Sequence, residues 1–391
     1  MPCLNAAFSV DSSVSSFLNM EMLKSLKVSS IMAFFAWCLV LPPFFTPATL
    51  YVYPSTNAFV VVEPVGLLQI NNATEGSRFA YSPPTERATI NKVTDERRTF
   101  TGPRTILTLL AGATASLGEI LPIKPPYNHS SYSVQMYAPI VRCDSANEST
   151  EALIDSLLQT KMREKVGTAT QTENAYWAFV PVYDANGTLQ AVDKPRNQAP
   201  SNATNQIWMR IQRYSLSFNG TRARETIHQV CQVYNASYDA HLSWDHGFQN
   251  ITGSYEVLNR VDYPRDVPVS DLVQHSYSAF LWVIADQVVG TFGWFENLDH
   301  SDSDGMPAQF GSIDSALKST SLLGTSDLDL YSNLKLKGEK NLYGEDRTEN
   351  GTLGDQRQQD KALAKNRTMD LLIEELSFNL TLSLLHNPLL K

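Results

Sequence analysis

Several segments in the middle of the chain show a strand-like alternation of apolar and polar residues, and this pattern constrains the fold most. An Asn186-Gly187 pair separates two further strand-like runs, residues 176–183 and 188–192, and favours the tight turn of a β-hairpin. A period of two residues is typical of antiparallel strands with one buried face. The predicted strands cover residues 132–142, 176–183, 188–192, 206–218, 226–244 and 251–261.

Helices are predicted before, between and after these strands. Ser149 can cap one of them, and leucines recur every four residues in the last one. The apolar stretch 279–295 carries Asp286 at its centre, so we expect a buried helix there rather than a membrane span. Strands in the middle and helices on both sides predict an α+β fold, with a mixed, mainly antiparallel β ectodomain and flanking helices. The predicted helices cover residues 104–117, 148–165, 269–289 and 361–385.

An uncharged apolar segment, residues 28–41, lies near the N-terminus. Lys24 and Lys27 precede it, and two prolines follow it. Its strictly apolar part is shorter than the roughly 20 residues that a spanning helix needs. Two main interpretations stay open: a cleaved signal peptide, or an uncleaved anchor that leaves the lysines in the cytosol. A buried core helix is the weaker third. The uncleaved anchor makes the bilayer a partner of residues 28–50, and either main interpretation places most of the chain outside the cytoplasm.

Asn-x-Ser/Thr sequons are in excess in the part of the chain after this segment. Eleven of the 24 asparagines begin one, where chance predicts about four. Polar loops rich in these residues are the ordinary explanation, and N-glycosylation in the secretory pathway is the functional one. The sequons begin at Asn72, Asn128, Asn147, Asn186, Asn202, Asn219, Asn235, Asn250, Asn350, Asn366 and Asn379.

The charge balance argues against a nucleic-acid partner. The chain has 31 basic and 40 acidic side chains, a net charge of −9, and no basic cluster. Phosphate binding needs lysine and arginine to displace counterions. We therefore expect no nucleic-acid partner. The apolar segment and the sequons predict a location at a secretory membrane or the cell surface, where the partner would be a protein or a glycan that the sequence does not identify.

Two cysteines, Cys143 and Cys231, lie beyond the apolar segment. In an oxidising compartment a single disulfide is their simplest state, and two separate buried thiols are the alternative. Cys3 and Cys38 lie in the N-terminal tail and the apolar segment. The chain has neither a CxxC pair nor a Cys/His zinc spacing, so we predict no metal site and no cofactor.

These observations predict six regions. They are a tail (1–23), an anchor or signal segment (24–50), an extended segment (51–100), an ectodomain core (101–298), a flexible polar insertion (299–360), and a C-terminal helix that packs on the ectodomain (361–391).

Several short strings of the chain form a familiar set: Trp37, 41–42, 47–52, 118–122, 126–133, Gln135, Pro139, Cys143, 231–238, 247–249 and 374–383. Together they resemble a family of fungal integral membrane proteins, often labelled formylmethionine deformylase-like. The resemblance implies a large glycosylated domain between an N-terminal group of membrane helices and one C-terminal helix. It also implies pairing of Cys143 with Cys231, and no established activity. This chain departs from that pattern, since it has one N-terminal apolar segment and no closing apolar helix.

The deformylase label fails on the residues themselves. Peptide deformylases hold a metal with a cysteine and an HExxH helix, whose glutamate is the general base. None of the seven histidines of this chain is followed by glutamate. We predict no deformylase activity and identify no catalytic residue.

Two polar clusters resemble parts of metal sites. In residues 241–246, His241, Ser243 and Asp245 share one face of a strand while His246 points to the other, so a surface hairpin is the better interpretation. Residues 299–305 resemble half of a calcium loop, but the position that needs a bidentate glutamate holds Gly311. A solvated acidic turn is the better interpretation there.

Two functions of different classes remain. The first is a membrane-anchored, N-glycosylated ectodomain with a role in binding, adhesion or cell-surface structure. The second is a secreted or anchored hydrolase with unrecognised catalytic carboxylates. A flat, glycan-bearing face would favour the first, and a convergent carboxylate pair in a cleft would favour the second. Tryptophans that could stack on sugars, but that more often belong to a core, are Trp177, Trp208, Trp244, Trp282 and Trp294.

Overall fold

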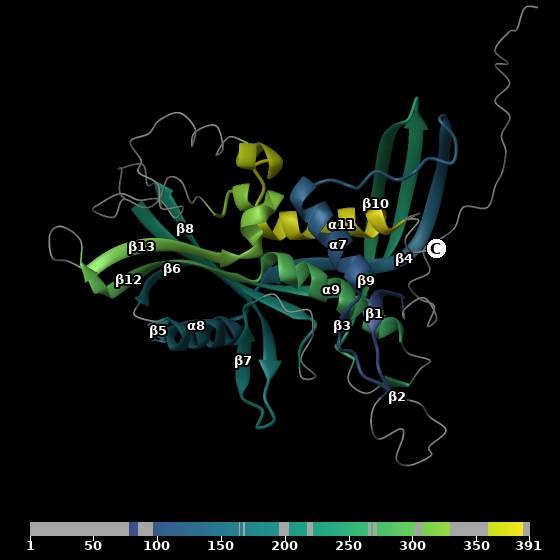
Figure 1. Ribbon diagram of the computed structural model, residues 1–391. Helices are drawn as coiled ribbons and strands as arrows, with labels where there is room; N and C mark the ends of the chain where they lie inside the picture. Colours follow the sequence, from purple (N-terminus) through teal and green to yellow (C-terminus); the bar gives the residue numbers. More distant parts are fainter. Residues whose placement is uncertain are drawn as a thin grey trace, which may run out of the picture. The chain divides into compact units, whose positions relative to one another are not determined.

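Figure 1 shows a computed structural model of the chain, which describes ten ranges of its residues. The chain divides into two units, Met1–Val65 and Gly66–Lys391, and every described residue belongs to the second. The predicted tail, anchor and most of the extended segment therefore lie outside the described residues. Within the described ranges, no helix has the length and apolar character needed to cross a bilayer. The ranges are 78–84, 97–163, 165–166, 169–194, 203–216, 222–264, 267–268, 272–301, 307–328 and 359–385.

One antiparallel sheet dominates the described ranges, and its strand order is β10-β9-β8-β6-β12-β13. Strand β4 pairs with the other edge of β9, and the short strands β5 and β7 pair with β6. The sheet and its helices make the fold α+β. The strands are β4 (Ser130–Ser145), β5 (Lys165–Val166), β6 (Ala169–Tyr183), β7 (Leu189–Val192), β8 (Gln206–Leu216), β9 (Arg222–Asp245), β10 (Phe248–Arg260), β12 (Gly290–Ser301) and β13 (Pro307–Ser315).

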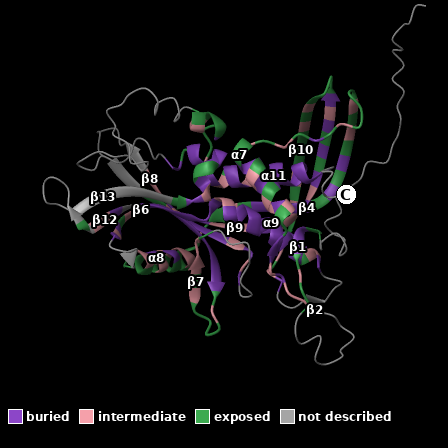
Figure 2. Cartoon of the chain, in the orientation of Figure 1, coloured by how far each residue is buried: buried purple, intermediate pink, exposed green. Residues whose placement is uncertain are grey.

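Helices cover both faces of the middle of this sheet. Helices α7 (Thr105–Leu117), α9 (Val273–Val288) and α11 (Met369–Leu384) lie on one face, and α8 (Glu148–Arg163) lies on the other (Figure 1). The larger core lies under α7, α9 and α11, and the smaller core lies under α8. Buried residues accordingly concentrate where helices meet strands (Figure 2).

Alternation along β6 and β8 sorts their side chains between the two cores. Tyr176 and Ala178 belong to the larger core, whereas Trp177 and Phe179, one residue further on, belong to the smaller. In β8, Trp208 likewise faces α8 while its neighbours face the larger core. Both strands therefore read as apolar runs, because successive side chains point to opposite faces and both faces are covered.

The predicted helix at 279–295 is wrong in its second half. Helix α9 ends at Val288, and β12 begins at Gly290, which has a φ of 136°. A Cβ atom at Gly290 would lie 2.2 Å from the carbonyl oxygen of Asp314 on β13. Glycine is therefore required for this switch from helix to paired strand.

The β12–β13 hairpin corrects the prediction that residues 299–360 form a flexible insertion. Strand β13 pairs with β12, and the 3-10 helices η3 (Ala316–Ser319) and η4 (Ser321–Gly324) follow it with buried leucines. Residues 307–324 thus belong to the folded unit. The predicted boundary at residue 100 is crossed as well, because β1 (Ala80–Tyr81) pairs with β3 (Gly102–Pro103).

The remaining predicted elements are present with shifted ends, the largest at β6, which begins seven residues earlier than predicted, and at α11, which begins eight residues later. The four regularly spaced leucines of α11 are all buried against the larger core. The cap of α8 is Asn147 rather than Ser149, since the backbone N–H of Thr150 donates to Asn147 Oδ1 at 2.9 Å. Helix α9 begins at Val273, because the preceding Val267 and Pro268 form strand β11 with β2 (Arg97–Arg98).

Candidate functional site

Strands β4, β9 and β10 extend together past the helices as a three-stranded arm. The arm consists of residues 130–138, 236–245 and 248–257, and the register pairs each strand directly with the next. Cys143 and Cys231 form a disulfide near its base, directly across the β4–β9 pair. The predicted cysteine pair is therefore present in the fold.

One face of the arm is apolar and covered. Val134, Leu242 and Trp244 are buried there, and Phe378 of α11 stacks against Tyr238 with ring centroids 5.8 Å apart. The backbone N–H of Ile123 donates to Gln249 Oε1 at 2.7 Å, which holds the segment after α7 against the arm. Covering this face fixes the register, because a slip of one residue would expose every apolar side chain.

The opposite face carries hydroxyl, amide and carboxylate groups and no lysine or arginine. We call it the polar face. Across the strands, Ser133 stands opposite His241, which stands opposite Thr252. His241 lies 3.1 Å from the hydroxyls of both Ser131 and Ser133. The polar face comprises Ser131, Ser133, Gln135, Tyr137, Ser237, Asp239, His241, Ser243, Asn250, Thr252, Ser254 and Glu256.

The arm confirms the predicted surface hairpin around residues 241–246. Strands β9 and β10 are joined by His246 and Gly247, which both have positive φ, at 50° and 84°. Two left-handed residues match the twist of an antiparallel pair, so the turn is tight. His241 contacts serines on β4, whereas His246 contacts Asp245 at 2.8 Å.

The sequon asparagines differ in their accessibility. Asn250 lies on the polar face, and Asn128 lies at the tip of the arm; both are exposed, as are Asn147, Asn186 and Asn366. Asn235 is half-buried, and its Oδ1 accepts a hydrogen bond from the Tyr277 hydroxyl at 2.8 Å. The remaining sequons at Asn72, Asn202, Asn219 and Asn350 lie outside the described residues.

Among the described sequon asparagines, Asn379 on α11 is buried. Its side chain is 7% exposed, and its Nδ2, the atom to which a glycan is attached, donates to the carbonyl of Gly118 at 3.2 Å. A glycan at this nitrogen would have to displace the packing of α11 on α7. This packing argues against the predicted glycan on Asn379.

A hollow of about 240 Å³ lies between the base of β10 and helix α9. Its walls include Asn235, Asn259 and Tyr277, and its one carboxylate, Asp262, pairs with Arg260 at 3.4 Å. Burial raises the pKa of Tyr277, so its hydroxyl stays protonated and donates. The hollow is thus rich in hydrogen-bonding groups but does not supply the pair of carboxylates that glycoside hydrolysis needs.

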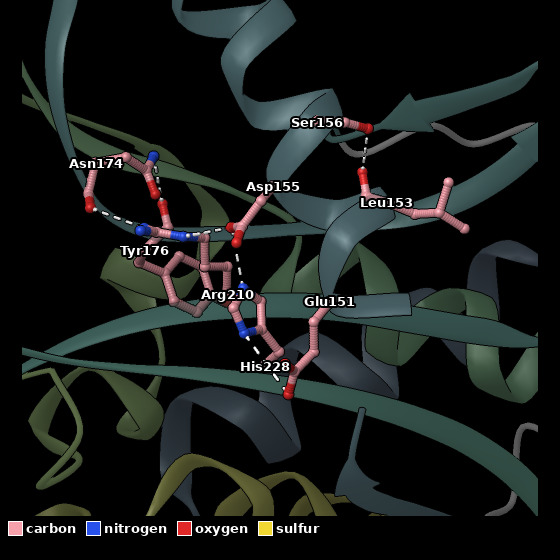
Figure 3. A network of polar contacts seen from close by, with 8 residues as sticks. All are labelled: Glu151, Leu153, Asp155, Ser156, Asn174, Tyr176, Arg210 and His228. Carbon is pink, nitrogen blue, oxygen red and sulfur yellow. Dashed lines mark hydrogen bonds and ion pairs between the residues drawn. The ribbon is translucent and has the colours of Figure 1, made fainter. Parts of the chain in front are cut away.

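A half-buried polar cluster fastens α8 to the sheet (Figure 3). Asp155 Oδ1 lies 3.1 Å from Arg210 Nε and 3.0 Å from His228 Nε2. The side chain of His228 on β9 is 8% exposed, and its Nδ1 lies 4.0 Å from Glu151, which is on α8 like Asp155. Arg210 also donates to the carbonyl of Asn174 at 3.4 Å. We call this the α8 cluster; its contacts join one helix to three strands.

A serine–histidine pair joins the residue that follows β1 to α9. Ser82 Oγ lies 2.7 Å from His275 Nδ1, the separation expected of a nucleophile and its base. His275 is fully buried, and burial lowers its pKa to about 4. In the described part of the chain, its Nε2 has no hydrogen-bond partner, so no third group orients the ring as in a catalytic triad. The pair acts as a tie between two elements.

Other residues singled out from the sequence do not form a site. Trp177, Trp208, Trp244 and Trp282 are buried in the two cores or the covered face of the arm. The acidic turn at 299–305 lies largely outside the described residues.

The α8 cluster and the contact of His129 with Asp245 at the β9–β10 turn were not predicted, since these residues come from segments far apart in sequence. Comparison with family models, curated proteins and solved structures gave no match. The resemblance to the fungal membrane family therefore stays a prediction, and the arm with its polar face is the candidate functional surface.

Proposed function

We propose that this chain is an N-glycosylated protein of the secretory pathway, held at a membrane through residues 28–50, whose arm binds a protein or glycan partner. The polar face carries this proposal. It is an exposed three-stranded surface with the sequon asparagine Asn250 on it, which supports a glycan-bearing binding face rather than a catalytic cleft.

The side chains of the polar face suit reversible recognition. Serine, threonine and asparagine supply adaptable hydrogen bonds, and a rigid tyrosine supplies contact area at low entropic cost. Tyr137 is 52% exposed in the centre of β4, directly across from Ser237, which stands opposite Glu256 on β10. Asp239 and Glu256 add negative charge without a neighbouring lysine or arginine on this face, which favours a partner with cationic or hydroxyl groups.

A glycan on Asn250 would divide the polar face. Strands rise about 3.4 Å per residue, so Glu256 lies about 20 Å from Asn250 along β10. The partner is therefore expected to bind at the Tyr137 end, away from the glycan. The disulfide at this end of the arm is consistent with an oxidising compartment.

The hydrolase alternative has weaker support. In the described part of the chain, the hollow beside α9 contains a single carboxylate that is paired with arginine, and the Ser82–His275 pair is enclosed. A hydrolase would need its acid and base elsewhere.

An endoglycosidase gel shift on protein from a eukaryotic host tests the proposal. The carbonate-washed membrane pellet and the supernatant are compared, with Asn250→Gln and Asn379→Gln as variants. We expect a shift in the pellet, a smaller shift for Asn250→Gln and an unchanged shift for Asn379→Gln. No shift in either fraction would refute the secretory topology, and a shift only in the supernatant would refute the anchor.

A further inference from the structure

The tip of the arm brings together three side chains with metal-ligating atoms. The turn residues His246 and Gly247 follow Asp245, and the backbone N–H of Gly247 donates to the carbonyl of Asn128 at 3.4 Å. This contact holds the residues before β4 against the turn. His129 consequently lies beside Asp245 and His246, although it is far from them in sequence.

Both imidazoles face the same carboxylate oxygen. His129 Nδ1 lies 3.0 Å and His246 Nδ1 lies 2.8 Å from Asp245 Oδ1. The two rings are nearly perpendicular, with centroids 4.4 Å apart and an interplanar angle of 82°. One potential ligand atom of each residue lies within 4.8 Å of the others. The three groups thus converge on one small volume.

The spacing suits a tetrahedral ion of the zinc class. Bonds of about 2.0–2.1 Å place neighbouring ligand atoms about 3.3 Å apart in a tetrahedron. The observed separations of 2.8 and 3.0 Å need to widen by only a few tenths of an ångström. The side chains are free to move by that amount, because His129, Asp245 and His246 are 63%, 82% and 75% exposed.

The donor set also limits the choice of metal. Two imidazole nitrogens and one carboxylate suit zinc, copper or nickel, whereas calcium and magnesium prefer oxygen ligands throughout. Three protein ligands at an exposed position leave coordination positions for water or an incoming donor, as in open zinc sites. The sequence suggested no such site, because the nearby His241 and His246 do not converge.

We propose that His129, Asp245 and His246 bind one divalent transition-metal ion of the zinc class at the tip of the arm. The ion cross-links the segment before β4 to the β9–β10 turn and presents open coordination positions to solvent. This proposal goes beyond the proposed function and does not depend on glycosylation or on a membrane.

Zinc titration of the purified full chain, after removal of metal with a chelator, tests the site by calorimetry. The variants are His129→Ala, His246→Ala and Asp245→Asn, and His129→Ala keeps the Asn128 sequon intact. We expect one zinc ion per chain in the wild type and an affinity at least about tenfold weaker in each variant. Zinc should also raise the thermal unfolding temperature of the wild type more than that of the variants.

The matched control is His241→Ala. This histidine is exposed on the same arm, but it contacts only the serines of β4 in the described residues. Its loss should leave zinc binding unchanged. No binding at about 1 mM zinc, far above the dissociation constants of protein zinc sites, would overturn the proposal. The proposal would also be overturned if the wild type and the ligand variants bound zinc equally well, or if His241→Ala lost as much zinc affinity as the ligand variants. Circular dichroism of the metal-free variants checks that they fold.

Discussion

Opening the Cys143–Cys231 disulfide tests how strongly it supports the fold. The two cysteines are 88 residues apart in sequence and directly opposite in the β4–β9 register. Closing a loop of that length restricts the unfolded chain and is worth about 4.5 kcal/mol at 25 °C. Most of the β4–β9 hydrogen bonds would survive reduction, so the loss should come mainly from the unfolded state.

Two perturbations separate the cross-link from its packing. Reduction of the wild type opens the bond without removing atoms, whereas the double variant Cys143→Ala/Cys231→Ala also removes two sulfurs, one of them fully buried at Cys231. We expect reduction to lower the free energy of unfolding by about 4 kcal/mol, and the double variant to lose about 1 kcal/mol more through its cavity.

Urea unfolding, followed by tryptophan fluorescence with and without reductant, measures both effects. The dependence of the unfolding free energy on urea should also steepen after reduction, since an unlinked chain exposes more surface. A loss below about 1 kcal/mol after confirmed reduction would refute the loop argument. An unchanged urea dependence combined with a large loss would place the effect in the folded state instead.

Three other perturbations follow from single contacts. Gly290→Ala should destabilise by more than about 3 kcal/mol, because its Cβ meets the Asp314 carbonyl at a positive φ; normal thermal unfolding would contradict the helix-to-strand switch. Asp155→Ala should cost about 1–2 kcal/mol in urea unfolding, because it leaves Arg210 and the buried His228 without their shared acceptor; a neutral outcome would show that the α8 cluster is dispensable. Burial lowers the pKa of His275 from 6.5 to about 4, so between pH 6.5 and about pH 4 the unfolded chain binds a proton at this histidine that the folded chain does not. Stability should fall as the pH drops through this window, by up to about 3 kcal/mol, and His275→Gln should show a shallower pH dependence; parallel curves would refute the assignment.

Local patterns predicted the elements that have one buried face. The strands of the arm show a clear alternation, and α11 shows leucines at helical spacing. The Asn186-Gly187 pair marked the turn between β6 and β7 by its turn residues alone. Local patterns did not separate the end of α9 from the start of β12 within residues 279–295, because a helix and a strand that are both buried form one continuous apolar run. Gly290 was the only local sign of the boundary, and its role depends on Asp314 from a later strand.

The polar sites could not be predicted for a related reason. Asp155 meets His228, and His129 meets Asp245, only because sheet register and helix packing bring distant segments together. Sequence spacing identified the histidines of the hairpin but assigned them no partner on β4. By contrast, the cysteine pair was accessible to sequence reasoning, because only two candidates lay beyond the apolar segment.

The long strand β9 also has a consequence for biosynthesis. It pairs with β4, β8 and β10, so the sheet cannot assemble around it until residues well beyond Cys231 have been synthesised. At about 5–20 residues per second, Cys143 waits about 4–18 s for its partner cysteine to be made. During that interval β4 exposes an unpaired edge and a free thiol in the nascent chain. Disulfide formation therefore has to follow synthesis of both strands, and β4 has no native partner on β9 until then.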